Sequence, residues 1–124
     1  MSIKTTFFSL YSLTLLACPV LADVAPYVYT NGGTTPETLV ACISSAKKQM
    51  RLAGYTENLQ VVYDESNSHS ASIFAVKKNK PISIAYRCMT NLSAWTYGIA
   101  ANDFDESWDA YSDFHNIVSE LLKE

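Results

Sequence analysis

The sequence has few of the residues, and none of the motifs, that usually carry enzyme chemistry. Its 124 residues include 3 cysteines and 2 histidines. It contains no Gly-x-Ser-x-Gly elbow, no His-Glu-x-x-His motif, no Cys-x-x-Cys pair and no phosphate-binding glycine loop. With His69 and His115 alone, a metal site would need carboxylates from scattered places. We therefore expect no catalysis, no metal and no other cofactor.

Basic residues are also scarce. The chain has 12 Asp and Glu against 9 Lys and Arg, which gives a formal net charge of −3 at pH 7. Nucleic acids and anionic membrane surfaces are bound by clustered Lys and Arg, so both are poor partners for this protein. A mildly acidic protein is better suited to a basic protein partner.

The apolar run near the N-terminus is too short to span a bilayer. It covers residues 7–16 and follows a weakly positive start that ends at Lys4. Val20 and Ala22 then precede Asp23 in the spacing of a cleavage site, and the whole layout is typical of a secretory signal peptide. We therefore expect residues 1–22 to be removed after transport across the inner membrane, and the remaining chain to be periplasmic.

Cys18 leaves an alternative open within this segment. Residues 15–18 resemble a bacterial lipobox, which would make Cys18 a lipidated N-terminus. Leu16 at the middle position and Pro19 after the cysteine are both atypical, so we favour soluble release. Lipidation would tether the same domain to a membrane without changing its fold.

The mature chain keeps two cysteines, Cys42 and Cys88. An even pair in an oxidising compartment predicts a disulfide, and two buried free thiols are the alternative. The bridge would close a 46-residue segment. The loop-entropy model assigns such a closure about 4 kcal/mol. That is a large share of the roughly 5–10 kcal/mol expected for a small domain.

The first part of the mature chain is expected to be a loose arm followed by a helix. Residues 23–34 contain Pro26 and the turn signal at residues 31–33, which predict a loosely held N-terminal arm. Residues 35–124 are then one α+β domain. Its first helix is expected to begin at Pro36, with Thr34 or Thr35 as its cap, and to end at Gly54. The predicted buried stripe is Leu39, Ile43, Ala46, Met50 and Ala53.

Four strands and a second helix complete the predicted fold. The strands cover residues 59–63, 72–76, 82–88 and 95–99, and their short connections favour an antiparallel meander. The last helix runs from about Asp105 to Leu122. Its predicted apolar face contains Trp108, Tyr111, Phe114 or His115, Val118, Leu121 and Leu122. The architecture is therefore α-β-β-β-β-α, with both helices on one face and one disulfide joining helix to sheet.

This layout resembles small exported bacterial proteins with a disulfide between a helix and the third strand of a meander. The residues that carry the resemblance are 38–43, 84–88 and 99–105, the last leading into Trp108. Some proteins with this layout are periplasmic immunity proteins of type VI secretion effectors, which block a toxin that acts on the cell wall or envelope. The resemblance implies a secreted effector, such as a cell-wall hydrolase, as the partner, and it assigns no binding residue.

The polar loop between the first two predicted strands is the first candidate for partner binding. An acidic loop can speed the encounter with a basic cleft and plug it. For His69, a solvated surface position is the alternative. The candidate residues are Asp64, Glu65, Asn67 and His69.

The acidic segment before the last helix is the second candidate. Asp103, Asp105 and Glu106 are a possible binding rim with aromatic neighbours, or simply acids that favour the start of a helix. Glycosidase chemistry is not expected, because that reaction needs two carboxylates opposed across a cleft.

We therefore expect a periplasmic inhibitor or immunity protein without catalysis. The alternative is a small envelope accessory protein or lipoprotein with a structural role, and a small secreted enzyme is a third reading. Homodimer formation through an exposed strand is compatible with the sequence. The basic residues Lys77, Lys78 and Lys80 are expected to protect a sheet edge from pairing.

Overall fold

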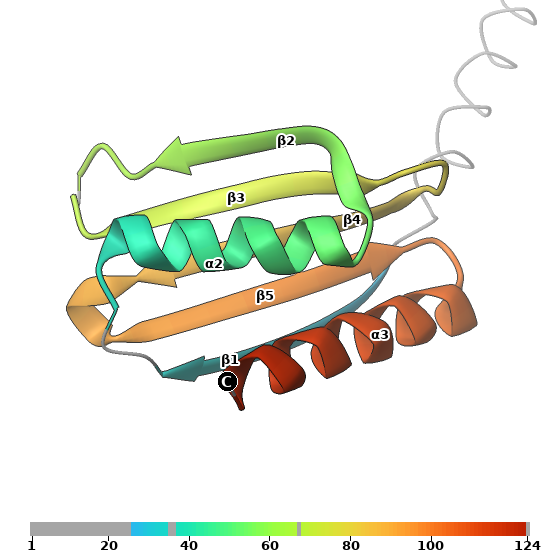
Figure 1. Cartoon of the computed structure of the whole chain (residues 1–124). Coiled ribbons are helices and arrows are strands. Elements are labelled where there is room, and N and C mark those ends of the chain that lie inside the picture. The colour runs from blue at the N-terminus through green and yellow to red at the C-terminus, as the bar shows by residue number, and fades with distance from the viewer. Residues whose placement is uncertain (1–25, 35–36, 67, 124) are drawn as a thin grey trace, which may run out of the picture.

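The computed structural model describes residues 26–34, 37–66 and 68–123 (Figure 1). The expected signal peptide, including Cys18, lies outside the described residues. The elements in chain order are β1 (Tyr27–Thr34), α2 (Leu39–Leu52), β2 (Tyr55–Tyr63), β3 (Ser70–Lys77), β4 (Ile82–Met89), the short helix η1 (Thr90–Leu92), β5 (Ala94–Ala101) and α3 (Phe104–Leu122).

The five strands form one antiparallel sheet in the order β1-β5-β4-β3-β2. The predicted α+β class and the β2-β3-β4-β5 meander are confirmed. The predicted number of four strands is wrong, because the sheet has a fifth strand at its edge. The observed order of elements is therefore β-α-β-β-β-β-α rather than α-β-β-β-β-α.

The extra strand, β1, is formed by residues that we expected to be a loose arm. β1 pairs with β5 along its whole length, from Tyr27 opposite Ala101 to Thr34 opposite Ala94. The glycines that suggested a turn instead allow close packing. A Cβ atom built on Gly33 would lie 2.5 Å from Trp95 Cζ2, so the absence of a side chain lets the indole lie against the strand.

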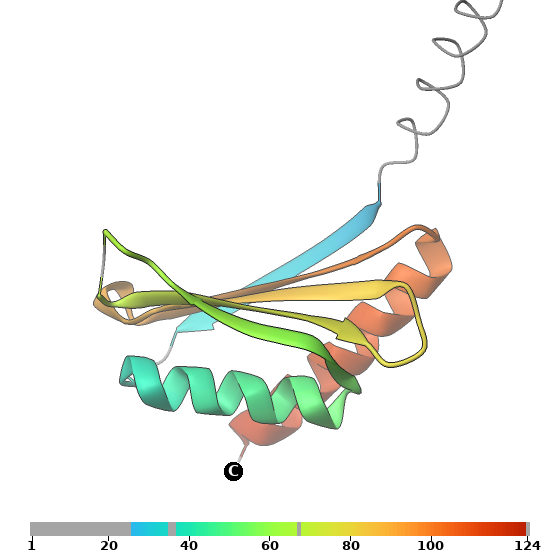
Figure 2. The same cartoon turned by 90° about the horizontal axis from the view of Figure 1, so that it is seen from above.

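Both helices cover the same face of the sheet, and the opposite face carries no helix in the described part of the chain (Figure 2). α2 packs on β2, β3 and β4, whereas α3 packs on β1 and β5. Ile73, Ile84, Tyr97 and Phe114 are among the buried side chains of the core between these two layers. Of Phe114 and His115, which the sequence left as alternatives, Phe114 is the core residue. Neither helix is long and apolar enough to cross a membrane, as judged over the described residues.

α2 begins at Leu39, whereas the expected start at Pro36 and the expected cap Thr35 lie outside the described residues. Thr38 is the N-cap, and its hydroxyl accepts a hydrogen bond of 3.2 Å from the Ala41 amide. The expected cap Thr34 belongs to β1, because pairing with β5 extends the strand to that residue. At the other end, Gly54 has a φ of 86°, as expected for the glycine that follows a helix.

A disulfide joins Cys42 on α2 to Cys88 on β4, as predicted, with 6.1 Å between the two Cα atoms. Both cysteines are buried in the core. The bond therefore fixes the first turns of α2 against the centre of the sheet.

Candidate partner-binding sites

The two candidate segments lie at opposite ends of the sheet. The loop that begins with Asp64 follows β2 and precedes β3, whereas the segment at Asp103 connects β5 to α3. β2 and β5 are not neighbours in the sheet, but they run in opposite directions, so their C-terminal ends lie at opposite ends of the sheet (Figure 1). The two segments are therefore described as separate sites.

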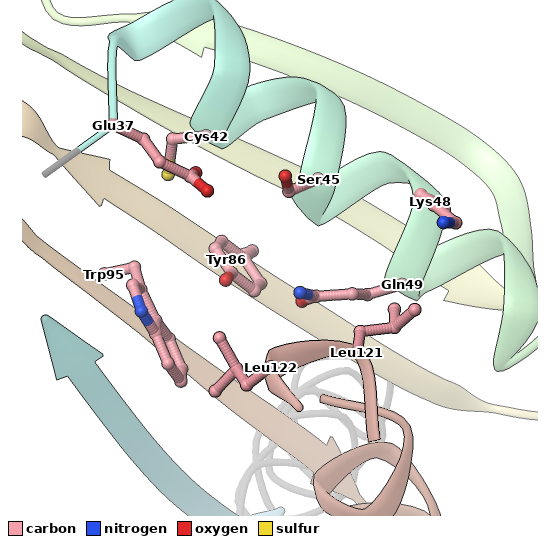
Figure 3. A pocket seen from close by; sticks show the side chains of 9 residues that line it. All are labelled: Glu37, Cys42, Ser45, Lys48, Gln49, Tyr86, Trp95, Leu121 and Leu122. Carbon is pink, nitrogen blue, oxygen red and sulfur yellow. The ribbon is translucent and has the colours of Figure 1, made fainter. Parts of the chain in front are cut away.

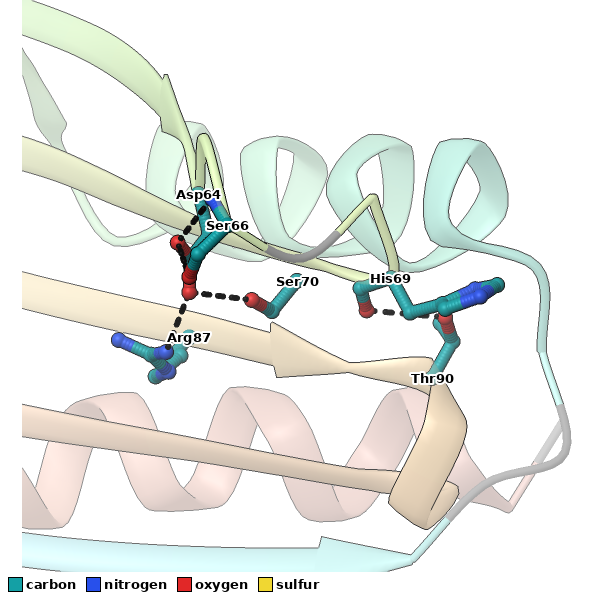
Figure 4. A network of polar contacts seen from close by, with 6 residues as sticks. All are labelled: Asp64, Ser66, His69, Ser70, Arg87 and Thr90. Atoms are coloured by element: carbon teal, nitrogen blue, oxygen red, sulfur yellow. Dashed lines mark hydrogen bonds and ion pairs between the residues drawn. The ribbon is translucent and has the colours of Figure 1, made fainter.

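In the polar loop, Asp64 is held by several donors (Figure 4). Its Oδ1 accepts hydrogen bonds from the Ser66 amide at 3.1 Å and the Ser66 hydroxyl at 2.8 Å. Its Oδ2 accepts from the Ser70 hydroxyl at 3.2 Å and lies 3.6 Å from Arg87 Nη2. The carboxylate thus holds its own loop together, and the hydroxyls of Ser66 and Ser70 are used as its hydrogen-bond donors.

These contacts lower the pKa of the Asp64 carboxyl below its ordinary value of 3.8. The hydroxyl of Ser66 is the largest cause, followed by the Ser66 amide, because both donate to the charged form. The Arg87 ion pair adds less and is partly exposed. Asp64 is therefore a fixed negative charge at neutral pH.

The other predicted residues of this loop follow Asp64 in the chain. Glu65 and His69 are exposed. The His69 carbonyl accepts hydrogen bonds from the amide and the hydroxyl of Thr90, at 2.9 and 3.0 Å, which ties the loop to η1. Asn67 lies outside the described residues. Of the two predicted carboxylates in this loop, Glu65 is thus the exposed one, and Asp64 is held by hydrogen bonds.

At the other end of the sheet, the predicted acidic residues have different roles. Asp103 is the N-cap of α3, and its Oδ2 accepts a 2.9 Å hydrogen bond from the Glu106 amide. Asp105 and Glu106 lie in the first helical turn, where negative charge is favourable. Asp105 is exposed and Glu106 is half-buried. Of the three predicted residues, Asp105 is therefore the one most available to a partner.

Aromatic side chains from β1 and α3 pack together at the start of α3, whose first turn contains Asp105. Tyr27 and Phe104 pack edge to face with 5.6 Å between their ring centroids. The ring centroids of Tyr29 and Trp108 are 5.2 Å apart. Tyr27, Phe104 and Trp108 remain 48%, 53% and 48% exposed. We call Tyr27, Phe104, Asp105 and Trp108 the acidic-aromatic rim. Tyr and Trp are enriched among the residues that dominate binding energy at protein interfaces.

The tyrosine of this rim was missed in the sequence because its segment was expected to be a loose arm. In the structure, the Ser107 hydroxyl donates a 2.9 Å hydrogen bond to the Tyr27 carbonyl and holds β1 to α3. The alternation of Tyr27 and Tyr29 was the available signal, since aromatic residues at every second position favour a strand.

His115 takes part in a polar cluster between α3 and the sheet. Asn31 Nδ2 lies 2.9 Å from His115 Nδ1, and because an amide nitrogen only donates, this ring nitrogen accepts. The Tyr97 hydroxyl lies 3.3 Å from the same nitrogen, and burial raises the pKa of Tyr97. The cluster joins β1, β5 and α3, which is consistent with a structural role for His115.

Within the described ranges, no three His, Cys, Asp or Glu side chains are placed to hold a metal ion together. Comparison with protein-family models, with curated proteins and with solved structures gives no match to this chain. The sites are therefore interpreted from their own residues.

Proposed function

We propose that this protein is an exported inhibitor of the immunity type, which binds a secreted toxin that attacks the cell envelope. The observation that carries the proposal is the acidic-aromatic rim of Tyr27, Phe104, Asp105 and Trp108. Three half-exposed rings at the start of α3, where the exposed Asp105 also lies, suit a basic surface, because aromatic rings and carboxylates both attract Lys and Arg. The protein's net charge of −3 acts in the same direction.

Two further features support an inhibitor rather than an adaptable scaffold. The disulfide between Cys42 and Cys88 fixes helix to sheet, and a rigid binder loses less entropy on association. The loop around Asp64 is likewise braced by hydrogen bonds, and it lies with the exposed Glu65 at the far end of the sheet. Since the two sites are at opposite ends, a single cleft would engage one of them, and the rim has the aromatic anchors.

A protection assay tests the proposal. A strain that lacks this gene is grown against toxin-secreting neighbours, and survival is measured after complementation with the wild-type gene or a variant. We expect the deletion to lower survival and the wild-type gene to restore it. Survival with the variant Phe104→Ala/Asp105→Asn should be at least about tenfold lower than with the wild-type gene, because the variant lacks one aromatic ring and one charge of the rim.

Glu65→Gln is the matched control, since it removes one carboxylate from the other end of the sheet. We expect it to protect like the wild type. The opposite ranking of the two variants would place the binding site at the polar loop. A deletion strain that survives as well as its parent would exclude the inhibitor function and leave the envelope accessory role in its place.

A further inference from the structure

A cavity of about 160 Å³ lies between α2 and the end of α3, away from both candidate partner-binding sites. Its floor is the sheet, and its walls come from one side of α2 and the last turn of α3 (Figure 3). We call it the α2–α3 cavity. The side chains that line it are Glu37, Cys42, Ser45, Lys48, Gln49, Tyr86, Trp95, Leu121 and Leu122.

Gln49 is the unusual member of this lining. It is 5% exposed, and its amide end is directed into the cavity toward Tyr86 (Figure 3). Among the described residues, no side chain or backbone group donates a hydrogen bond to Gln49 Oε1. A buried acceptor without a donor destabilises the fold, so a core glutamine at this position needs another explanation. A ligand that brings an N–H donor supplies one.

The remaining polar groups also attract donors and positive charge. Burial is the main cause that raises the pKa of the Tyr86 hydroxyl, and the negative charge of the nearby Glu37 carboxylate raises it further. Trp95 forms the adjoining wall, with its ring 5.9 Å from that of Tyr86. A carboxylate, an amide oxygen and an indole face are the groups that bind ammonium and guanidinium ions in proteins.

One lining residue carries the opposite charge. Lys48 is exposed and lies along α2 on the side of the cavity away from Trp95 (Figure 3). Its long, flexible side chain can place its ammonium group in solvent. Glu37 is exposed too, but its carboxylate is directed toward the cavity (Figure 3). This carboxylate and the buried Gln49 and Trp95 therefore determine the chemistry of the interior.

The cavity is also rigid where its walls meet the sheet. Cys42 is held to β4 by the disulfide, and Trp95 lies against the backbone of Gly33. A site whose walls are fixed before binding loses little free energy to reorganisation.

We propose that the α2–α3 cavity binds a small organic cation, through an alkylammonium or guanidinium group placed between Glu37, Gln49 and Trp95. The donors of the cation would satisfy Gln49 Oε1, and its charge would pair with Glu37 over the indole. This proposal is independent of the proposed inhibitor function, because it concerns a different surface and a different ligand.

Fluorescence of Trp95 tests the ligand class. The chain has two tryptophans, so Trp108→Phe leaves Trp95 as the reporter. Agmatine is titrated as the free cation, acetyl-Gly-Arg-Gly-amide as an arginine within a peptide, and butyrate as an anion at equal ionic strength. We expect saturable changes with agmatine and none with butyrate. Binding of the peptide as well would identify an arginine or lysine of a partner protein as the source of the cation.

Substitutions in the lining test the binding groups. Glu37→Gln should weaken agmatine binding about tenfold, and the matched charge change Glu57→Gln on β2 should leave it within about twofold. Gln49→Met should weaken binding and raise Tm by about 4 °C or more, because it removes the unpaired acceptor. A purely structural role for Gln49 predicts the opposite change in Tm.

Two results would overturn the proposal. One is the failure of agmatine and the peptide to give saturation at concentrations up to about 10 mM. The other is binding of butyrate that equals or exceeds binding of agmatine, which would assign the cavity to anions and its recognition to Lys48. Retention of full agmatine affinity by Glu37→Gln would contradict the role assigned to that carboxylate.

Discussion

The absence of a side chain at Gly33 allows Trp95 to pack against β1. A Cβ atom on Gly33 would lie 2.5 Å from Trp95 Cζ2 and 2.8 Å from Trp95 Cε2. Gly33→Ala should therefore displace the indole and lower the free energy of unfolding by about 1–3 kcal/mol in urea denaturation. Gly98→Ala is the control, because its nearest contact would be an ordinary 3.4 Å. Equal stability of the two variants would contradict the packing described for Trp95.

Asp64 carries the pH dependence expected of the polar loop. Its folded-state pKa lies below 3.8, so the hydrogen bonds of the carboxylate are fully formed above the unfolded-state pKa. They are lost as the pH falls through the folded-state value. A carboxyl titration by NMR should give a midpoint below 3.8, and Ser66→Ala should move it upward. Ser68→Ala, in the same loop, should not. A wild-type midpoint at or above 3.8 would contradict the network.

At the scale of elements, the sequence predicted what depends on local pattern and missed what depends on distant pairing. The α2 and α3 helices, the meander and the disulfide all follow from periodicity, short turns and cysteine number. β1 was missed because residues 31–33 are a turn signal by themselves. Only β5, more than sixty residues away, makes them a strand. Gln49 was missed because a glutamine on a helix is normally assigned to solvent.

The start of α2 shows how an element depends on one hydroxyl. Thr38 Oγ1 accepts a hydrogen bond from the Ala41 amide, which has no partner within the helix. Thr38→Ala should lower the free energy of unfolding by about 1 kcal/mol. Ser44→Ala, at an exposed position within α2, should be neutral or slightly stabilising, since alanine is the better helix former. Thermal unfolding of the three proteins makes the comparison, and equal losses for both variants would argue against Thr38 as the cap.

For the whole molecule, the disulfide should be the largest single contribution to stability. Cys42→Ala combined with Cys88→Ala removes a link across 46 residues and should lower the free energy of unfolding by about 4 kcal/mol. Both residues are buried, so part of the loss is a packing term, and a reduced wild-type sample separates the two. Reduction alone that leaves the unfolding curve unchanged would contradict the role given to the bond.

The function proposed for this molecule depends on its leaving the cytosol and becoming oxidised there. The most direct test is the intact mass of the protein recovered from the envelope fraction of its own cell, after thiol labelling without reductant. We predict a chain that begins at Asp23 and takes up no label, with Cys42 and Cys88 joined. A full-length chain in the cytosol with labelled Cys42 and Cys88 would contradict the account of an exported, disulfide-linked inhibitor.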